Sequence, residues 1–203
     1  TILRGADLTD ANLTGVDLSG RDLTGTILRG IDLTDKDLSG ANLSFVDLSE
    51  HDLMGTNLSD TVLFRTNLSG MDLRHITLTN ADFRYAILSE SRLPDSLLVN
   101  NNFDHAILHN INFAGKDLSK SLFREVGLEG SDMQNTNLSN TTFLQVDFTK
   151  IKNKSLAGAD LSVASFEHSN LSGVNISEAI IIGTSFWKAD LSGQDFTVIS
   201  KAS

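Results

Sequence analysis

The stretch Ala6-Asp7-Leu8-Thr9-Asp10 is restated along almost the whole of the 203-residue chain. It is followed directly by ANLTG, VDLSG and RDLTG, and further on by IDLTD, KDLSG and ANLSF. Its central apolar residue, here called position i, returns every fifth residue from Leu3 to Phe148 and again from Leu156 to Phe196. A tandem array of this kind decides the fold class before any other local signal, so the pattern predicts a repeat protein.

Each five-residue unit predicts a very short extended segment followed by a sharp corner. Position i is almost always Leu or Phe, the residue two before it is usually small, and the residue between them is mostly Asp or Asn. This in, out, in alternation is typical of extended backbone with position i buried. Of the 15 glycines, 14 lie at i+2, all except Gly127. A type II turn requires positive φ there.

The phenylalanines indicate how many units complete one coil. Phe83, Phe103, Phe123 and Phe143 recur every 20 residues, which predicts four units per coil. The same column continues at Phe166 and Phe186 after a shift of three residues within 149–155. We therefore expect a stacked core column and a three-residue surface bulge in one domain over residues 1–200, with a tail over 201–203. The core column consists of Phe83, Phe103, Phe123, Phe143, Phe166 and Phe186.

These units resemble the pentapeptide-repeat family, whose pattern A-(D/N)-L-x-x is matched from Thr1 to about Ser200 in 39 units. The resemblance implies an all-β fold, a right-handed quadrilateral parallel β-helix. It would be a solenoid of about ten coils with four pentapeptides each, with positions i and i−2 pointing inward.

Composition argues against several classes of function. The chain has no cysteine and a net charge of −10, so we expect no disulfide, no thiol metal site and no direct nucleic-acid binding. It contains no apolar run long enough for a transmembrane helix. The five histidines lack metal-ligand spacing, and no nucleophile, base and orienting group come together. We therefore expect no enzyme, no cofactor and no membrane partner; the compartment stays open between the cytoplasm and secretion.

The period assigns every outward residue to one of four faces, each named here after its first i residue. The Leu8 and Leu18 faces carry mostly short hydroxyl side chains, as expected of a solvated wall. The Leu3 face differs most, because it carries all the aromatic residues at outward positions together with several arginines. Such residues are enriched at protein interfaces, although they could also fill grooves at the corners above the phenylalanine column. The candidate partner-binding residues are Phe45, Phe64, Arg65, Arg84, Tyr85, His105, Arg124 and Trp187.

Two further sets of charged residues stand out. The Leu13 face carries an acidic column, in which each Asp could either hydrogen-bond the neighbouring turn or belong to an acidic surface. Long polar side chains also occupy inward i−2 positions, where we expect them to extend to the surface at the corners. The acidic column is Asp32, Asp52, Asp72, Asp132 and Asp195, with Arg74 and Arg92 beside it, and the inward residues are Arg21, Lys36, His51 and Lys116.

The leading hypothesis is a non-enzymatic rod or scaffold that binds another protein through the Leu3 face. The resemblance implies an alternative, because acidic fluoroquinolone-resistance members of the family are thought to occupy the DNA-binding surface of gyrase or topoisomerase IV. A third reading is a repeat domain of a secreted bacterial effector. Neither end shows a helical capping pattern, so we expect either flanking sequence beyond this segment or association through the ends, end to end or as a homodimer.

Overall fold

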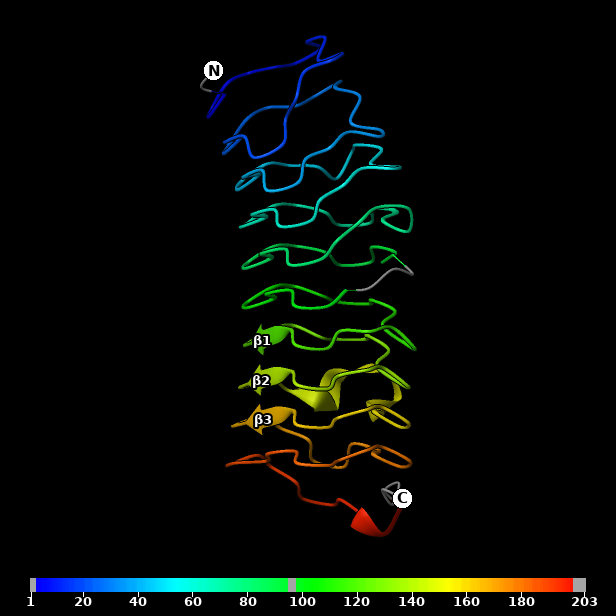
Figure 1. Cartoon of the computed structure of the whole chain (residues 1–203). Coiled ribbons are helices and arrows are strands. Elements are labelled where there is room, and N and C mark those ends of the chain that lie inside the picture. The colour runs from blue at the N-terminus through cyan, green and yellow to red at the C-terminus, as the bar shows by residue number, and fades with distance from the viewer. Residues whose placement is uncertain (1–2, 95–97, 199–203) are drawn as a thin grey trace.

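The computed structural model describes residues 3–94 and 98–198, and the chain winds as a stack of similar turns with its two ends at opposite poles (Figure 1). Three strands pair in parallel in the order β1 (Leu122–Arg124), β2 (Thr142–Leu144) and β3 (Ser165–Glu167). All three lie on the Leu3 face. Elsewhere in the described ranges, strand pairing between coils is limited to isolated parallel bridges, so the paired segments there are shorter than these three strands.

The pairing register confirms the period of 20 residues. Asp22 pairs with Asn42, and Asn42 with Val62, whereas Asp147 pairs with Asn170, 23 residues away. The spacing returns to 20 where Ser155 pairs with Asn175. The three extra residues therefore lie between Asp147 and Ser155, where the chain forms two 3-10 helices, η1 (Phe148–Lys150) and η2 (Lys152–Lys154). A third, η3 (Phe196–Val198), ends the described chain, and the expected tail over 201–203 lies outside the described residues.

The core consists of the i residues of all four faces, which point toward the axis, as the alternation predicted. From Leu18 to Leu171 the side chains at position i are buried. Rings of the phenylalanine column stack at centroid distances of 5.1 Å for Phe83 and Phe103 and 4.8 Å for Phe123 and Phe143. Phe143 and Phe166 stack at 5.0 Å, so the column runs through the insertion. Uninterrupted stacking across the register shift keeps both sides of the insertion in one core.

The corners form at the positions that the sequence predicted. The N–H of Ala6 donates to the carbonyl of Leu3 at 2.9 Å, and equivalent i+3 to i bonds recur along the described chain. All 14 glycines at i+2 have positive φ, as predicted. Gly127 lies outside the i+2 positions and is glycine for another reason. A Cβ there would lie 2.6 Å from Nε2 of His109, which covers it. Its lack of a side chain leaves room for this imidazole.

The inward polar side chains form hydrogen bonds between or within coils. Thr66 Oγ1 donates to the carbonyl of Leu43, 23 residues earlier, at 2.9 Å, and other inward threonines repeat this bond. Lys36 Nζ and His51 Nε2 reach the carbonyls of Leu13 and Leu28 in the same way, at 3.5 and 2.9 Å. The remaining two also bond to carbonyls: Lys116 Nζ reaches Pro94 and Arg21 Nε reaches Asp17. Their role, which the sequence did not reveal, is to satisfy backbone acceptors near the corners.

Asn101 makes the most extensive of these bridges. At the corner after Leu78 the usual turn bond is replaced by the Asn101 amide, whose Oδ1 accepts from the N–H of Ala81 at 2.8 Å. Its Nδ2 donates to the carbonyls of Leu78 at 3.2 Å and Leu98 at 2.9 Å. The side chain is buried, so these bonds satisfy groups that water does not reach.

Candidate interaction surface

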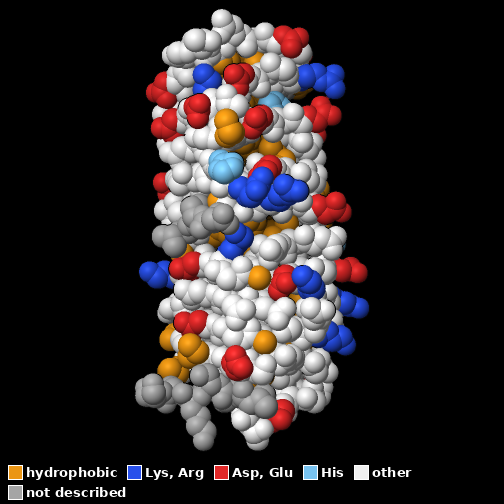
Figure 2. Space-filling model, turned by 90° about the vertical axis from the view of Figure 1, so that its right-hand side faces the viewer, with side chains coloured by type: hydrophobic (Ala, Val, Ile, Leu, Met, Phe, Trp, Pro, Cys, Tyr) orange, Lys and Arg blue, Asp and Glu red, His pale blue; other side chains and the backbone are white. Residues whose placement is uncertain are grey.

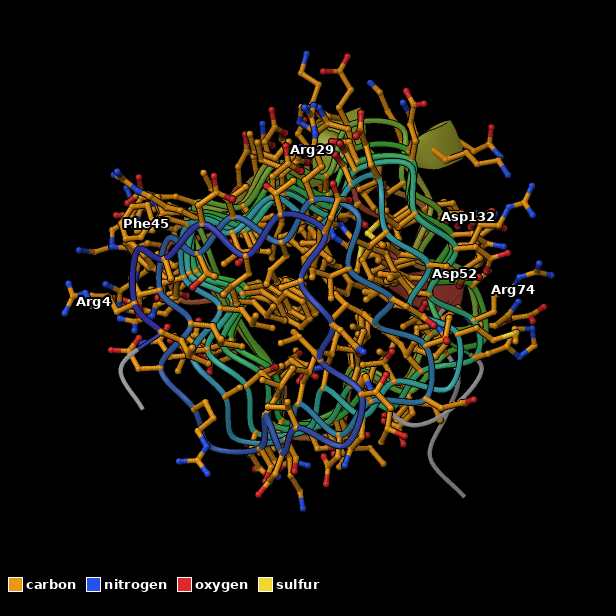
Figure 3. The ribbon with its side chains drawn as sticks, turned by 90° about the horizontal axis from the view of Figure 1, so that it is seen from above. Arg4, Arg29, Phe45, Asp52, Arg74 and Asp132 are labelled. Atoms are coloured by element: carbon orange, nitrogen blue, oxygen red, sulfur yellow. The ribbon has the colours of Figure 1, made fainter. Side chains whose placement is uncertain are left out.

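The Leu3 face has the most continuous backbone pairing between coils of the four faces. Parallel pairing runs without a gap from Asp22 through β1, β2 and β3 to Ser185. Seen along the axis in Figure 3, Arg4 and Phe45 of this face lie opposite Asp52, Arg74 and Asp132 of the Leu13 face. Exposed side chains on the Leu3 face therefore stand on a regular ladder spaced by one coil, roughly 4.8 Å.

Aromatic side chains form a continuous series across four coils of this face. Phe45 meets Phe64 edge to face with ring centroids 5.4 Å apart, and Phe64 meets Tyr85 in the same manner at 5.5 Å. Tyr85 then stacks on the His105 imidazole at 4.6 Å. Phe64 and His105 are half-buried, whereas Phe45 and Tyr85 remain 54% and 42% exposed. The series presents apolar ring surface to solvent.

Arginines flank the rings in two different ways. The Arg65 guanidinium carbon lies 5.5 Å from the ring centroids of both Phe64 and Tyr85, within cation–π range. Arg84 also lies 5.8 Å from the Phe64 ring, yet its Nη2 is 2.6 Å from Asp82 Oδ2. The hydrogen bond that Arg84 donates to Asp82 raises the pKa of Arg84, and this guanidinium is held in an ion pair.

The structure brings six of the eight candidate residues together, with Arg124 beside them and Trp187 apart. Phe45, Phe64, Arg65, Arg84, Tyr85 and His105 make one contiguous group, here called the aromatic cluster. Arg124 lies beside this group through Asp104, with its Nε 3.9 Å from Asp104 Oδ2. Trp187 is near the other end, where its ring contacts His168 and Lys188.

Two carboxylates of this face were not among the candidate residues that the sequence indicated. Asp82 holds Arg84, and Asp104 is 9% exposed with its Oδ1 buried and without a hydrogen-bond partner. Asp82 occupies the ordinary Asp position i−1 of the repeat, which carries no special signal. Asp104 lies at i+1, so the signal that could have found it was the alternation Arg84, Asp104, Arg124 down that column.

The i+2 column of the Leu3 face is unusual in its backbone. Left-handed φ favours Gly, Asn and Asp, which fill most i+2 positions on the other faces. After Gly5 and Gly25, no member of this column is one of those residues, although all have φ between 49° and 64°. They are Phe45, Arg65, Tyr85, His105, Glu125, Gln145, His168 and Lys188. Each accepts a conformation that costs about 1 to 2 kcal/mol for a residue with a Cβ, a pattern associated with functional surfaces.

A groove of about 820 Å³ begins beside Phe45 and continues onto the Leu8 face. Apolar Ile27 and Ile31 share its lining with carboxylates such as Asp47 and Glu50. Among the described residues, no group of three or more His, Cys, Asp and Glu is placed to hold a metal ion. The groove therefore has an acidic lining but no metal cage.

On the opposite side, the Leu13 face carries both signs of charge. Figure 2 views this side and shows acidic side chains with a basic group near the middle. Arg74 Nε donates to Asp72 Oδ1 at 2.8 Å, and Arg92 approaches the same carboxylate. Lys152 of η2 reaches Asp132 at 2.9 Å. Two members of the acidic column are thus paired with cations.

The acidic residues at i−1 also hold the corners, as one of the two readings predicted. Asp32 Oδ1 accepts from the N–H of Thr34 at 3.0 Å and from its hydroxyl at 2.7 Å. The hydrogen bond from the Thr34 hydroxyl is the main cause that lowers the pKa of Asp32, and the bond from the Thr34 N–H lowers it further. The same two donors, contributed by the Ser or Thr two residues on, lower the pKa values of Asp7, Asp17, Asp22, Asp37 and Asp195.

These lowered pKa values predict that acid destabilises the fold. Because the folded-state pKa lies below the unfolded value of about 3.9, the contribution is complete above about pH 5 and is lost as the pH falls. We expect the urea midpoint to decrease between about pH 5 and pH 2.

Asparagine accepts the same turn hydrogen bonds without titrating, so it supplies the control. A variant with Asp17→Asn, Asp32→Asn and Asp37→Asn is expected to show a flatter dependence of the urea midpoint on pH. A midpoint that rises on acidification, or an unchanged slope in the triple variant, contradicts this explanation.

The comparisons with known proteins agree with this architecture. The family model for pentapeptide repeats matches eight copies, over residues 1–30, 28–60, 61–100, 102–140 and 159–197. The chain therefore belongs to the pentapeptide-repeat family. Its fold is accordingly a right-handed quadrilateral β-helix. Members of this family are generally structural or binding scaffolds.

Two solved structures illustrate the likeness. HetL, a pentapeptide repeat protein involved in heterocyst differentiation regulation in Nostoc sp. strain PCC 7120, is 25% identical, with 93% of this chain and 86% of HetL covered and a TM-score of 0.44. QnrB1, a plasmid-mediated fluoroquinolone resistance protein, is 16% identical, with 86% of this chain and 77% of QnrB1 covered and a TM-score of 0.61. The QnrB1 likeness shows the shared fold alone.

A search of curated proteins found no match. No helix in the described ranges is long and apolar enough to span a bilayer.

Proposed function

We propose that this protein is a non-enzymatic rod of about ten coils that binds another protein through the aromatic cluster on its Leu3 face. The observation that carries the proposal is the contiguous exposure of Phe45, Tyr85 and Arg65 on the most regular ladder of the molecule. Aromatic and arginine side chains contribute most of the binding energy at protein interfaces. A wall that only faces solvent gains nothing from them.

Backbone strain supports the same assignment. Filling of corner grooves would require only side-chain volume, which residues outside the left-handed region could supply. Here large side chains occupy left-handed positions in successive coils, from Phe45 to His105. Retaining a destabilising conformation at consecutive positions of one face favours a role in binding.

The test compares two triple variants as immobilised baits in a lysate of the source organism. The first removes exposed groups from the Leu3 face (Phe45→Ala, Tyr85→Ala, Arg124→Gln), and the second is a matched change on the Leu18 face (Ser39→Ala, Ser139→Ala, Ile182→Ala). We expect the first to lose at least about tenfold in the amount of specific partner retained, which corresponds to about 1.4 kcal/mol. Retention of the partner should be unchanged in the second variant. Equal loss in both, or no loss in the first, rejects the Leu3 face as the binding surface.

A second candidate function is occupation of the DNA-binding surface of gyrase or topoisomerase IV. The net charge of −10 and the acidic residues at i−1 favour it, together with the QnrB1 fold, since QnrB1 is a fluoroquinolone resistance protein. The pairing of Asp72 and Asp132 with cations weakens the acidic surface on the Leu13 face. Inhibition of gyrase supercoiling, weakened by added salt, would favour this function over the first. The secreted-effector reading and association through the ends remain predictions.

A further inference from the structure

Arg65 differs from the other arginines of its surroundings in having aromatic rings rather than carboxylates as partners. Its guanidinium carbon lies 5.9 Å from the Phe45 ring centroid and 5.5 Å from those of Phe64 and Tyr85. Within the described part of the chain, no carboxylate forms an ion pair with it. Its positive charge is therefore exposed and uncompensated.

Nearby arginines provide the contrast. Arg84 has a two-pronged contact with Asp82, through Nε to Oδ1 at 2.8 Å and through Nη2 to Oδ2 at 2.6 Å. Arg124 lies beside Asp104, with 3.9 Å between Nε and Oδ2. A guanidinium already held by a carboxylate has less to gain from a second anion. Arg65 is thus the arginine of the aromatic cluster best suited to recognise a negative group from outside.

The rings also restrict how Arg65 can act. A guanidinium is planar and donates hydrogen bonds from its edges, so rings that occupy its faces leave those donors available. Contacts with three rings limit the rotamers of the long side chain, which reduces the entropy lost when a ligand binds. The left-handed backbone of Arg65, with φ of 56°, adds a local cost that packing on the rings offsets. Together these features describe a preorganised donor pair surrounded by apolar surface.

We propose that Arg65 binds a carboxylate of the partner protein, an Asp or Glu side chain whose apolar neighbour packs on Phe45 and Tyr85. This inference rests on the proposed function and specifies the partner chemistry of that surface. A carboxylate accepts two parallel hydrogen bonds from a guanidinium. A single carboxylate suits this rod better than a polyanion such as a nucleic acid, because the net charge of −10 repels a polyanion more strongly than one carboxylate.

The test uses short peptides as probes, followed by NMR on the isotope-labelled full chain. The probes are acetyl-Leu-Glu-Leu-amide and its uncharged analogue acetyl-Leu-Gln-Leu-amide, and the reporters are the Arg65 side-chain Nε–H and the backbone amides of Phe45 and Tyr85. We expect the Glu peptide to shift these signals and to bind at least about fivefold more tightly than the Gln peptide, as a charge-assisted contact requires.

Variants then assign the effect to Arg65. Arg65→Gln should abolish the preference for the Glu peptide, and Arg65→Lys should reduce it, because an ammonium group cannot form the planar pair. Arg92→Gln is the control, since it removes an exposed arginine of the Leu13 face, outside the aromatic cluster, and it should keep the preference within about twofold. Equal binding of the two peptides, or an undiminished preference in Arg65→Gln, overturns the proposal.

The two proposals fail in distinguishable ways. If the Leu3-face triple variant loses the natural partner while Arg65→Gln retains it fully, the binding surface stands and the carboxylate assignment is wrong. If both variants retain the partner, the proposed function itself is wrong.

Discussion

Replacing Phe123 with alanine is expected to lower the free energy of unfolding by about 3 to 5 kcal/mol. Phe123 is fully buried and stacks on Phe103 at 5.0 Å and on Phe143 at 4.8 Å. Its removal opens a cavity in the middle of the column and also eliminates two ring contacts, each contributing roughly 0.5 to 1.5 kcal/mol beyond burial. Urea denaturation of the variant measures the loss.

Leu23→Ala is the matched comparison in the same column. Leu23 is equally buried, but it lies among leucines and next to a first coil whose Leu3 is only partly buried. That coil can shift to fill part of the cavity, so we expect a smaller loss of about 2 to 3 kcal/mol.

Hydrogen exchange tests the same difference without any substitution. Stacked repeats are coupled mainly to their neighbours, so one end can open while the rest stays folded. We expect weaker amide protection before Leu63 than between Phe83 and Phe143. Uniform protection along the rod, or a Leu23→Ala loss as large as that of Phe123→Ala, contradicts this gradient of stability.

The second large effect is expected at Asn101. Asn101→Ala removes the amide that bridges the opened corner, leaving the N–H of Ala81 without its acceptor and the Leu78 carbonyl without this donor. An unsatisfied buried group costs about 1 to 3 kcal/mol, so we expect a loss of about 2 to 4 kcal/mol in the free energy of unfolding.

The neighbouring Asn102→Ala serves as the control, measured by the same urea denaturation. Asn102 is half-buried and its Oδ1 accepts one bond, from the N–H of Asp104 at 3.0 Å. Its replacement should cost about 1 kcal/mol or less. If Asn101→Ala costs no more than Asn102→Ala, the corner closes by itself and the bridge is not a source of stability.

The sequence alone determined the backbone of this protein. A five-residue period with two inward positions, i and i−2, and one left-handed position leaves few ways to stack, and the phenylalanines then set 20 residues per coil. Because residues 20 apart lie directly above one another, the spacing also predicted the stacked rings, their continuation to Phe166 and the side of the rod that carries Phe45 and Tyr85. Each of these follows from one repeated local geometry.

Only the tertiary structure decided what the long polar side chains do. Arg65 and Arg84 occupy adjacent coils of one face, yet one packs against rings and the other pairs with Asp82. Asn101 stands where the repeat expects a small residue, and its bonds depend on a corner that opens in the coil before it. A flexible side chain chooses among several partners of similar energy in neighbouring coils, so its contacts depend on the local packing rather than on its place in the repeat.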